Sequence, residues 1–352
     1  MAGRIEWVHE AARFAELGEE WERVAALNGF PFADHAWFQA WWEAFGTGQL
    51  AVCVLWEDGQ LRAALPLSEA RGRLTGLANF HTPAFAIPAH DAQALDRVVE
   101  EALRRSHGEL ALHAVVASDP LREALVQAAA SQGQLLLVEQ IHRSPRVDIS
   151  GTFESFVRGR GSRFKDIPRR WRKLNREHQV SFAFAEPFES LEKELQRGYE
   201  VEAAGWKGSA GTAILSSPQT RAFYTAVARA YQARGELRLV WLTVDGQPAA
   251  FNFCLERDSS LYCLKAGVDD RFRPLAPGLL IDYCTVERCF DLGLERYELL
   301  GADEPYKRYF ATSYSDHVRL RSYRRRPAPV MRYLARRIGR PLVLSARERL
   351  AR

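Results

Sequence analysis

Four side chains that could move protons or bind anions lie close together near the end of the chain. They are Asp303, Glu304, Tyr306 and Lys307, in the sequence GADEPYKRYF (301–310). Carboxylates beside a lysine and a phenol suit either a proton relay or a clamp for a phosphate group. A solvated loop is the alternative interpretation of the same residues.

A second group of candidates comes from the sequence LYCLKAGVDD, which we expect to form a strand. Asp269 lies at the end of this strand, where its carboxylate could accept a proton from a reacting group directly or through water. Gly267 could permit a distortion of this strand. Backbone N–H groups freed by such a distortion could stabilise a developing oxyanion. An aspartate in a simple turn is the alternative.

The sequence RPLAPGLL, between that strand and the next expected helix, has the residues of a phosphate-binding turn. Pro277, Gly278 and Leu279 would form the first helical turn, whose N–H groups lack intrahelical partners and whose dipole is positive. Such a helix start can bind the pyrophosphate of coenzyme A or another phosphate. Arg271 and Arg273 could add positive charge. The alternative is that these residues form an ordinary turn between a strand and a helix and bind nothing.

The sequence EAAGWKG suggests a site for an acceptor molecule at the end of a helix near Gly205. Glu202 and Trp206 are four residues apart, so in one helix they would share a face, with Lys207 beside them. An aromatic platform next to an acid and a base would suit recognition of an acceptor molecule. A buried tryptophan with a capping glycine is the alternative.

These candidates belong to a pattern of elements that occurs twice. The sequences VCVLWEDGQLRAALPL (52–67) and LVWLTVDGQPAAFNFC (239–254) each have an apolar run, then Asp-Gly-Gln, then another apolar run. Asp-Gly supplies the positive φ angles of a tight hairpin. In both halves we expect a helix, a three-stranded meander, a helix and a strand. The order predicts a duplicated α/β domain.

Length and composition agree with a globular protein of two domains. The chain has 352 residues, 47% of them hydrophobic. The five cysteines form no C-x-x-C pair, so we expect small buried side chains in a reducing compartment. The nine histidines lack metal-ligand spacing, and we expect no metal. We see no signal peptide and no apolar run of the ~20 residues that span a bilayer. A cytoplasmic protein, soluble or peripheral at the inner face of the membrane, is therefore expected.

The positive charge is concentrated in two segments. Residues 158–178 carry a net charge of +7 and residues 321–352 a net charge of +10, whereas the whole chain carries only +4. This distribution suggests an anionic partner, and a phosphorylated or lipid-linked glycan, an anionic membrane and tRNA all remain open. Apolar residues in the second segment have helical spacing, which points to a membrane surface or, alternatively, to a docked terminal helix: Val330, Met331, Leu334 and Ile338.

The sequence EVEAAGWKGSAGTAILSSPQTRAFY resembles GNAT-superfamily acyltransferases of cellulose- and exopolysaccharide-synthesis loci, which are two-lobed relatives of the Fem peptidyltransferases. The resemblance continues at LTVDGQPAAFNFCL, KAGVDDRFRPLAPGLLI and LGADEPYKRYF. In the first half it includes HAWFQAWWEAFG and DGQLRAALPL, so it covers about residues 30–320. Two features depart from the family. Val268-Asp269 replaces an aromatic-Asp pair, and the glycine-rich pyrophosphate signature is reduced to Pro277-Gly278.

The resemblance implies an α/β fold with tandem, duplicated GNAT-like domains, each a mixed, mostly antiparallel sheet flanked by helices. We expect an N-terminal lobe at 1–145, a basic connecting segment at 146–180 and a catalytic lobe at 181–325. An Arg-rich amphipathic tail at 326–352, which could contact an anionic membrane surface, would follow.

The implied activity is direct transfer of an acyl group from acetyl-CoA or another acyl-CoA to an amine on an amino sugar or amino acid, with a small molecule or a cell-envelope glycan as acceptor. Fem relatives have a lysine at the donor site at the position that matches Lys307. The expected residues are, for catalysis, Lys307, Asp269 and Glu304; for the donor, Pro277, Gly278, Leu279 and Arg273; and for the acceptor, Glu202, Trp206, Lys207 and Tyr306. Two alternatives remain open: an aminoacyl-tRNA-dependent peptidyltransferase, in which the basic helix holds tRNA, and a degenerate, non-catalytic fold that binds polyanions.

Overall fold

The computed structural model describes residues 3–185 and 189–350. The chain divides into two compact units, which we call the first unit (Met1–Ile141 with Asp316–Arg352) and the second unit (His142–Ser315). These limits differ from the sequence-based ones. Residues after 315 belong to the first unit because their strand pairs within it, and residues 146–180 belong to the second unit because their helix packs into its core.

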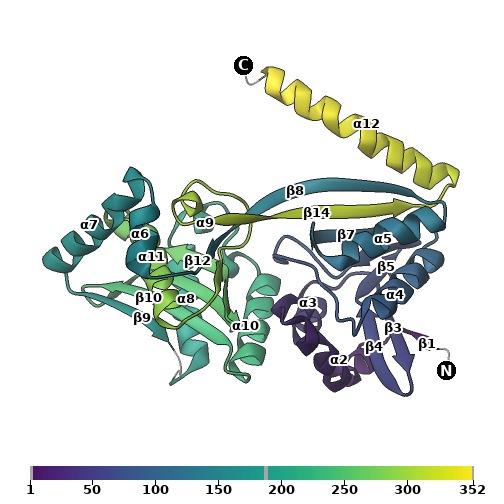
Figure 1. Cartoon of the computed structure of the whole chain (residues 1–352), viewed down its shortest axis with the longest axis horizontal. Coiled ribbons are helices and arrows are strands. Elements are labelled where there is room, and N and C mark those ends of the chain that lie inside the picture. The colour runs from purple at the N-terminus through teal and green to yellow at the C-terminus, as the bar shows by residue number, and fades with distance from the viewer. Residues whose placement is uncertain (1–2, 186–188, 351–352) are drawn as a thin grey trace. The chain divides into compact units, whose positions relative to one another are not determined.

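The first unit contains two sets of paired strands with helices beside them (Figure 1). One set has the order β1-β3-β4, and the other has the order β2-β5-β6-β7-β14-β8. β6 and β7 form a parallel pair, and α4 connects them. The elements are β1 (Arg4–Val8), α1 (Ala11–Glu16), α2 (Gly18–Ala25), α3 (His35–Phe45), β2 (Gln49–Leu50), β3 (Val52–Glu57), β4 (Gln60–Leu65), β5 (Leu67–Ala70), β6 (Arg73–Gly76), α4 (Ala92–Arg105), β7 (Glu109–Val116), α5 (Pro120–Ser131), β8 (Leu135–Asp148), β14 (Ser313–Tyr323) and α12 (Pro327–Leu350).

In the second unit the strand order is β8-β13-β12-β11-β10-β9, which begins with the last residues of β8. The pair of β12 and β13 is parallel and is connected by α11, whereas the neighbouring pairs are antiparallel. The elements are α6 (Phe153–Gly159), α7 (Ser162–Glu177), β9 (Val180–Ala185), α8 (Leu191–Ala203), α9 (Trp206–Ser209), α10 (Pro218–Gln232), β10 (Leu237–Val244), β11 (Gln247–Arg257), β12 (Ser260–Val268), η4 (Asp270–Leu275), α11 (Pro277–Asp291), β13 (Arg296–Glu298) and η5 (Lys307–Tyr309). The expected α/β fold, with mixed, mostly antiparallel strands flanked by helices, is confirmed.

Both Asp-Gly hairpins form as the sequence predicts. β3 pairs with β4 and β10 pairs with β11, each across a two-residue turn. The turn residues have positive φ angles of 50° and 77° at Asp58 and Gly59, and of 50° and 75° at Asp245 and Gly246. Two consecutive left-handed residues twist the chain as the flanking strands require.

Helices cover both faces of the second unit's sheet (Figure 1). On one face, Leu280 and Cys284 of α11 belong to a core cluster with Val240 and Cys254 of β10 and β11. On the other face, Gly198 of α8 lies so close to β11 that an added Cβ would be 2.4 Å from the Phe251 ring. Alternate residues of each strand therefore serve two different helical layers.

The basic helix α7 contains a proline in its interior. It starts at Ser162 and includes Pro168. Phe164, Ile167 and Leu174, at helical spacing, are buried in the core of the second unit. Their burial stabilises the first turns, which the proline alone would disfavour.

Candidate functional site

β12 separates from β13 part of the way along its length. β12 pairs with β11 from Ser260 to Val268, with an irregularity at Leu264. It pairs with β13 only at Ser260, Leu261 and Tyr262. Beyond Tyr262, no strand within the described residues pairs with the side of β12 that faces away from β11. Backbone N–H and C=O groups on that side lack the usual ladder partners.

Gly267 has a different role from the one that the sequence suggested. A Cβ on Gly267 would be 2.7 Å from Cα of Glu202, so the glycine lets α8 lie against β12. Gly205 acts in the same way, because its added Cβ would be 2.4 Å from the carbonyl oxygen of Val268. The two glycines hold the end of α8 against the end of β12.

The start of α11 offers fewer unpaired amides than expected. Ala276, with φ 54°, precedes the helix, and its carbonyl accepts hydrogen bonds from the amides of Leu279 and Leu280 at 3.1 and 3.2 Å. Pro277 has no N–H, so the described structure leaves Gly278 as the residue of this turn whose amide has no hydrogen-bond partner. The expected cradle of several free amides, Leu279 included, is therefore corrected to the single amide of Gly278.

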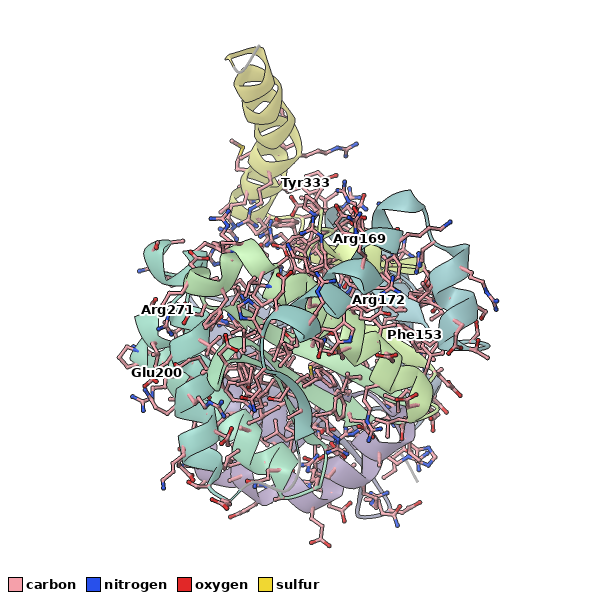
Figure 2. All side chains as sticks on the ribbon, turned by 90° about the vertical axis from the view of Figure 1, so that its left-hand side faces the viewer. Phe153, Arg169, Arg172, Glu200, Arg271 and Tyr333 are labelled. Carbon is pink, nitrogen blue, oxygen red and sulfur yellow. The ribbon has the colours of Figure 1, made fainter. Side chains whose placement is uncertain are left out.

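Asp269 lies beside this turn but is already engaged. Its carboxylate accepts a hydrogen bond from the backbone amide of Arg271 at 2.9 Å and from the Arg271 guanidinium at 2.6 to 3.1 Å (Figure 2 labels Arg271). These bonds with Arg271 lower the pKa of Asp269. The geometry favours a capping role at η4, and catalysis by Asp269 stays a prediction. Arg273 is exposed.

Lys307 is buried, and its ammonium group contacts the loop that follows β13. Nζ donates to the carbonyl oxygens of Leu300 at 2.7 Å and Ala302 at 3.3 Å, and it lies 3.3 Å from Oε2 of Glu304. Leu300, with φ 50°, and Gly301, with φ 63°, are consecutive left-handed residues. A bulky residue in this conformation is uncommon, and such strain is frequent at functional sites.

A buried polar group that the sequence analysis missed lies inside the second unit. Oδ1 of Asp282, on α11, accepts hydrogen bonds from Nδ2 of Asn252 at 3.1 Å and from the Tyr297 hydroxyl at 3.3 Å. Burial raises the pKa of Asp282 to about 6, although the two hydrogen bonds and the Lys307 charge oppose this. The sequence does contain a sign of this group, because Asp282 and Asn252 lie inside the apolar sequences GLLIDYC and AAFNFC. A polar residue in such a sequence must find a hydrogen-bond partner when it is buried.

Tyr306 contributes a phenol to the same region. Its ring is partly exposed, yet burial around the phenol oxygen raises its pKa well above the ordinary value. The charges of Asp282 and Glu304 raise the pKa further. Tyr306 therefore stays a neutral phenol near neutral pH, able to donate a hydrogen bond.

The residues expected to bind the acceptor do not form one face. Glu202 is only 1% exposed, whereas Trp206 is 61% exposed. The helical spacing did not apply because α8 ends at Ala203 and Trp206 begins α9. Glu202 accepts a hydrogen bond from the Ile214 amide at 2.7 Å and lies 3.4 Å from Nζ of Lys207.

Lys207 connects this region to the separated half of β12. Its Nζ donates to the carbonyl oxygen of Ala266 at 2.6 Å. Lys265, which the sequence analysis did not single out, lies 3.7 Å from Glu202, and burial lowers the pKa of this lysine. Glu202 and the two lysines thus fix the backbone of β12, while Trp206 is exposed to solvent.

Some kinds of site are not found in the described part of the chain. Among residues 3–185 and 189–350, no three His, Cys, Asp or Glu side chains are grouped in a way that could hold a metal ion. Within these same ranges, no helix has both the length and the apolar character needed to cross a bilayer. All five cysteines are free and buried, as the sequence predicts.

Comparison with known proteins supports a GNAT-type fold. Residues 161–308, most of the second unit, match the sequence profile of the acetyltransferase (GNAT) domain. Among curated protein sequences, none matches the chain significantly.

Three solved structures are similar over most of the chain. The C-terminal domain of a putative lysylphosphatidylglycerol synthetase from Agrobacterium fabrum has a TM-score of 0.57 and 12% identity, with 92% of this chain and 97% of that chain covered. FemX has a TM-score of 0.57 and 9% identity, with 90% and 97% covered. L-PGS from Bacillus licheniformis has a TM-score of 0.52 and 12% identity, with 88% and 98% covered. At these identities the likeness establishes the fold alone.

Proposed function

We propose that the second unit is an N-acyltransferase that moves an acyl group from an acyl-CoA to an amine by direct attack. The observation that carries the proposal is the separation of β12 from β13 beside the free Gly278 amide. The match of residues 161–308 to the acetyltransferase domain supports it. Acetyl-CoA, or another acyl-CoA, is thus proposed as the donor substrate.

In this proposal the backbone of β12 polarises the thioester carbonyl. Residues beyond Tyr262 direct amide groups away from β11 with no strand to accept their hydrogen bonds. Such preorganised donors stabilise the oxyanion of a tetrahedral intermediate, and one donor contributes about 10²- to 10³-fold in rate. The Gly278 amide would donate to a phosphate oxygen of the same donor molecule.

We assign the charge-stabilising role to Lys307 and the role of base to Glu304. Three oxygen atoms surround Nζ of Lys307 within 3.3 Å, which matches the three N–H donors of an ammonium group. A lysine held in this way suits stabilisation of negative charge better than removal of a proton. Glu304, beside it and partly exposed, can accept the proton of the attacking amine.

For the acceptor we propose an amine on an amino sugar or amino acid, related to the cell envelope or to exopolysaccharide. Exposed Trp206 supports this choice, because an aromatic face packs well against a sugar ring or an apolar side chain. Tyr306 would donate a hydrogen bond from its neutral phenol.

A matched pair of variants tests the assignment. Thiol release from acetyl-CoA is measured with a panel of amino sugars and amino acids. Lys307→Ala and Glu304→Gln should each lower kcat at least about a hundredfold. Arg308→Ala removes the adjacent exposed cation, which pairs with Asp303 at 3.0 Å, and should leave kcat almost unchanged. Full activity in both the Lys307 and Glu304 variants would refute these roles and leave Asp269 as the remaining candidate base.

A second candidate function is an aminoacyl-tRNA-dependent transfer of the Fem type. The similarity to FemX and the exposed cations of α7 favour it. The test is binding of tRNA at two salt concentrations: salt-sensitive binding of tRNA without binding of coenzyme A would support this candidate and contradict the first one.

We also propose that α12 contacts an anionic membrane surface. Met331, Leu334 and Ile338 are exposed at helical spacing, while Tyr333 is buried and Arg336 pairs with Glu109. Sedimentation with vesicles should show binding to anionic phosphatidylglycerol but not to neutral phosphatidylcholine. Replacing the three exposed residues by serine should abolish the binding, and unchanged binding would contradict the proposal.

A further inference from the structure

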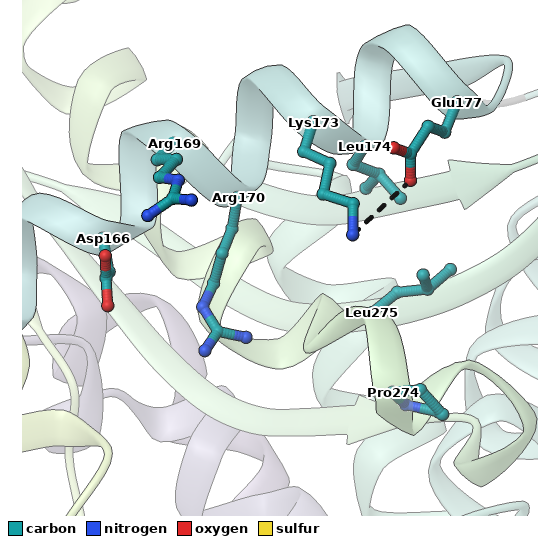
Figure 3. A pocket seen from close by; sticks show the side chains of 8 residues that line it. All are labelled: Asp166, Arg169, Arg170, Lys173, Leu174, Glu177, Pro274 and Leu275. Atoms are coloured by element: carbon teal, nitrogen blue, oxygen red, sulfur yellow. Dashed lines mark ion pairs between the residues drawn. The ribbon is translucent and has the colours of Figure 1, made fainter.

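A hollow of about 330 Å³ lies between α7 and η4 in the second unit (Figure 3). It is separate from the gap between β12 and β13, and the proposed function does not use it. Its walls combine cationic, acidic and apolar side chains, which come from two elements: Asp166, Arg169, Arg170, Lys173, Leu174, Glu177, Pro274 and Leu275.

Two of the cations in the hollow have no partner. In the described structure, the side chains of Arg169 and Arg170 have neither an ion pair nor a hydrogen bond, and no ion pair within 4.0 Å joins them to Asp166. Lys173 is 3.8 Å from Glu177, which leaves it only weakly compensated. In Figure 3, Arg170 and Lys173 extend from α7 towards η4. Guanidinium groups in this state are suited to bind phosphate in a bidentate manner.

The side of the hollow that η4 forms is apolar. Pro274 and Leu275 of η4 face α7, where Leu174 is buried in the core. The volume is at the lower end of the range for small-molecule pockets, which begins near 300 Å³. Cations at one side and apolar groups at the other fit a ligand with a phosphate and a flat ring, as in a nucleotide.

The hollow also lies near the proposed donor site. Leu275 is three residues before Gly278, so their Cα atoms are at most ~11 Å apart. The start of α11 supplies one free amide, too little to compensate the charges of a pyrophosphate and a further phosphate. Additional positive charge must come from nearby elements, and α7 is packed against α11.

We infer that this hollow binds the 3′-phosphorylated nucleotide end of acyl-CoA. Arg169 and Arg170 bind the 3′-phosphate, and Pro274 and Leu275 contact the adenine ring. This inference rests on the proposed function, since it assigns the second end of the same donor. It also supplies a ligand for the unpaired guanidinium groups of Arg169 and Arg170 on α7.

The experiment compares coenzyme A with 3′-dephospho-coenzyme A by isothermal titration calorimetry. The intact protein should bind coenzyme A about ten- to a hundredfold more tightly, which is the range for charge-assisted hydrogen bonds. The double variant Arg169→Gln/Arg170→Gln should bind both compounds with equal affinity, close to that of the intact protein for the dephosphorylated compound. The matched control, Arg172→Gln/Arg176→Gln, removes two cations from the same helix outside the hollow and should retain the preference.

Equal affinity of the intact protein for the two compounds would overturn the inference and leave the proposed function standing. A preference that survives in the Arg169/Arg170 variant would also overturn it. Adenosine 3′,5′-bisphosphate provides a readout that does not require an acyl donor. Its binding, lost in the Arg169/Arg170 variant and kept in the control, supports the hollow as a nucleotide site. Absence of this binding in the intact protein contradicts the inference.

Discussion

Replacing Asp282 with asparagine should change how the stability of the protein depends on pH. The carboxyl group is buried, and its pKa is raised from 3.8 to about 6. Asparagine has nearly the same shape, and its amide oxygen can still accept the hydrogen bonds from Asn252 and Tyr297. The substitution therefore removes the negative charge while it keeps the packing.

The size of the effect follows from the shift in pKa. A rise from 3.8 to about 6 corresponds to about 3 kcal/mol of free energy, since one pKa unit is about 1.4 kcal/mol. The folded protein holds this proton more tightly than the unfolded chain. The contribution of Asp282 to stability is fully present below pH 3.8 and is lost as the pH rises through 6.

Urea unfolding, followed by tryptophan fluorescence between pH 4 and pH 8, measures the difference in the free energy of unfolding between variant and parent. Asp282→Asn should gain about 2.5 kcal/mol relative to the parent between pH 4 and pH 8, because only the parent must ionise a buried acid. Other titrating groups are common to both proteins and cancel. A difference that stays constant over this range would refute the assignment of a raised pKa to Asp282.

Three further substitutions test the packing around β12. Gly205→Ala should destabilise the fold by about 1 to 3 kcal/mol in urea unfolding, since its Cβ would be 2.4 Å from the Val268 carbonyl oxygen; an unchanged midpoint would contradict this. Lys207→Met should lower the free energy of unfolding by about 2 kcal/mol, because Glu202 loses a partner while it stays buried; equal stability would show that the pair contributes nothing. Trp206→Ala should leave the melting temperature within about 2 °C and raise KM for the amine acceptor, and an unchanged KM would remove Trp206 from the acceptor site.

Much of the fold could be predicted from local sequence signals. The two Asp-Gly turns determine the hairpins because few residues adopt two successive positive φ angles. Apolar runs on both sides of the turns indicated strands, and α10 begins at Pro218, a residue typical of the first helical position. These features depend on residues near one another in the chain, so a single sequence is enough to find them.

The contacts of the candidate site depend on residues that are distant in the sequence. Asp282 and Asn252 are 30 residues apart, and only the packing of α11 on β11 brings them together. Gly267 was interpreted as a residue that permits a distortion of β12, whereas in the structure the absence of a side chain at Gly267 lets α8 lie against β12. The start of α11 has the expected residues. However, Ala276 is left-handed, and its carbonyl oxygen accepts hydrogen bonds from the amides of Leu279 and Leu280, which are therefore not free.

Hydrogen–deuterium exchange with and without acetyl-CoA tests the central claim most directly. If the donor lies in the gap between β12 and β13, residues 263–268 and the amide of Gly278 should exchange more slowly when acetyl-CoA is present. The hairpin of β3 and β4, which has the same turn in the first unit, should show no change. Protection at that hairpin with none at residues 263–268 would contradict the proposed location of the donor.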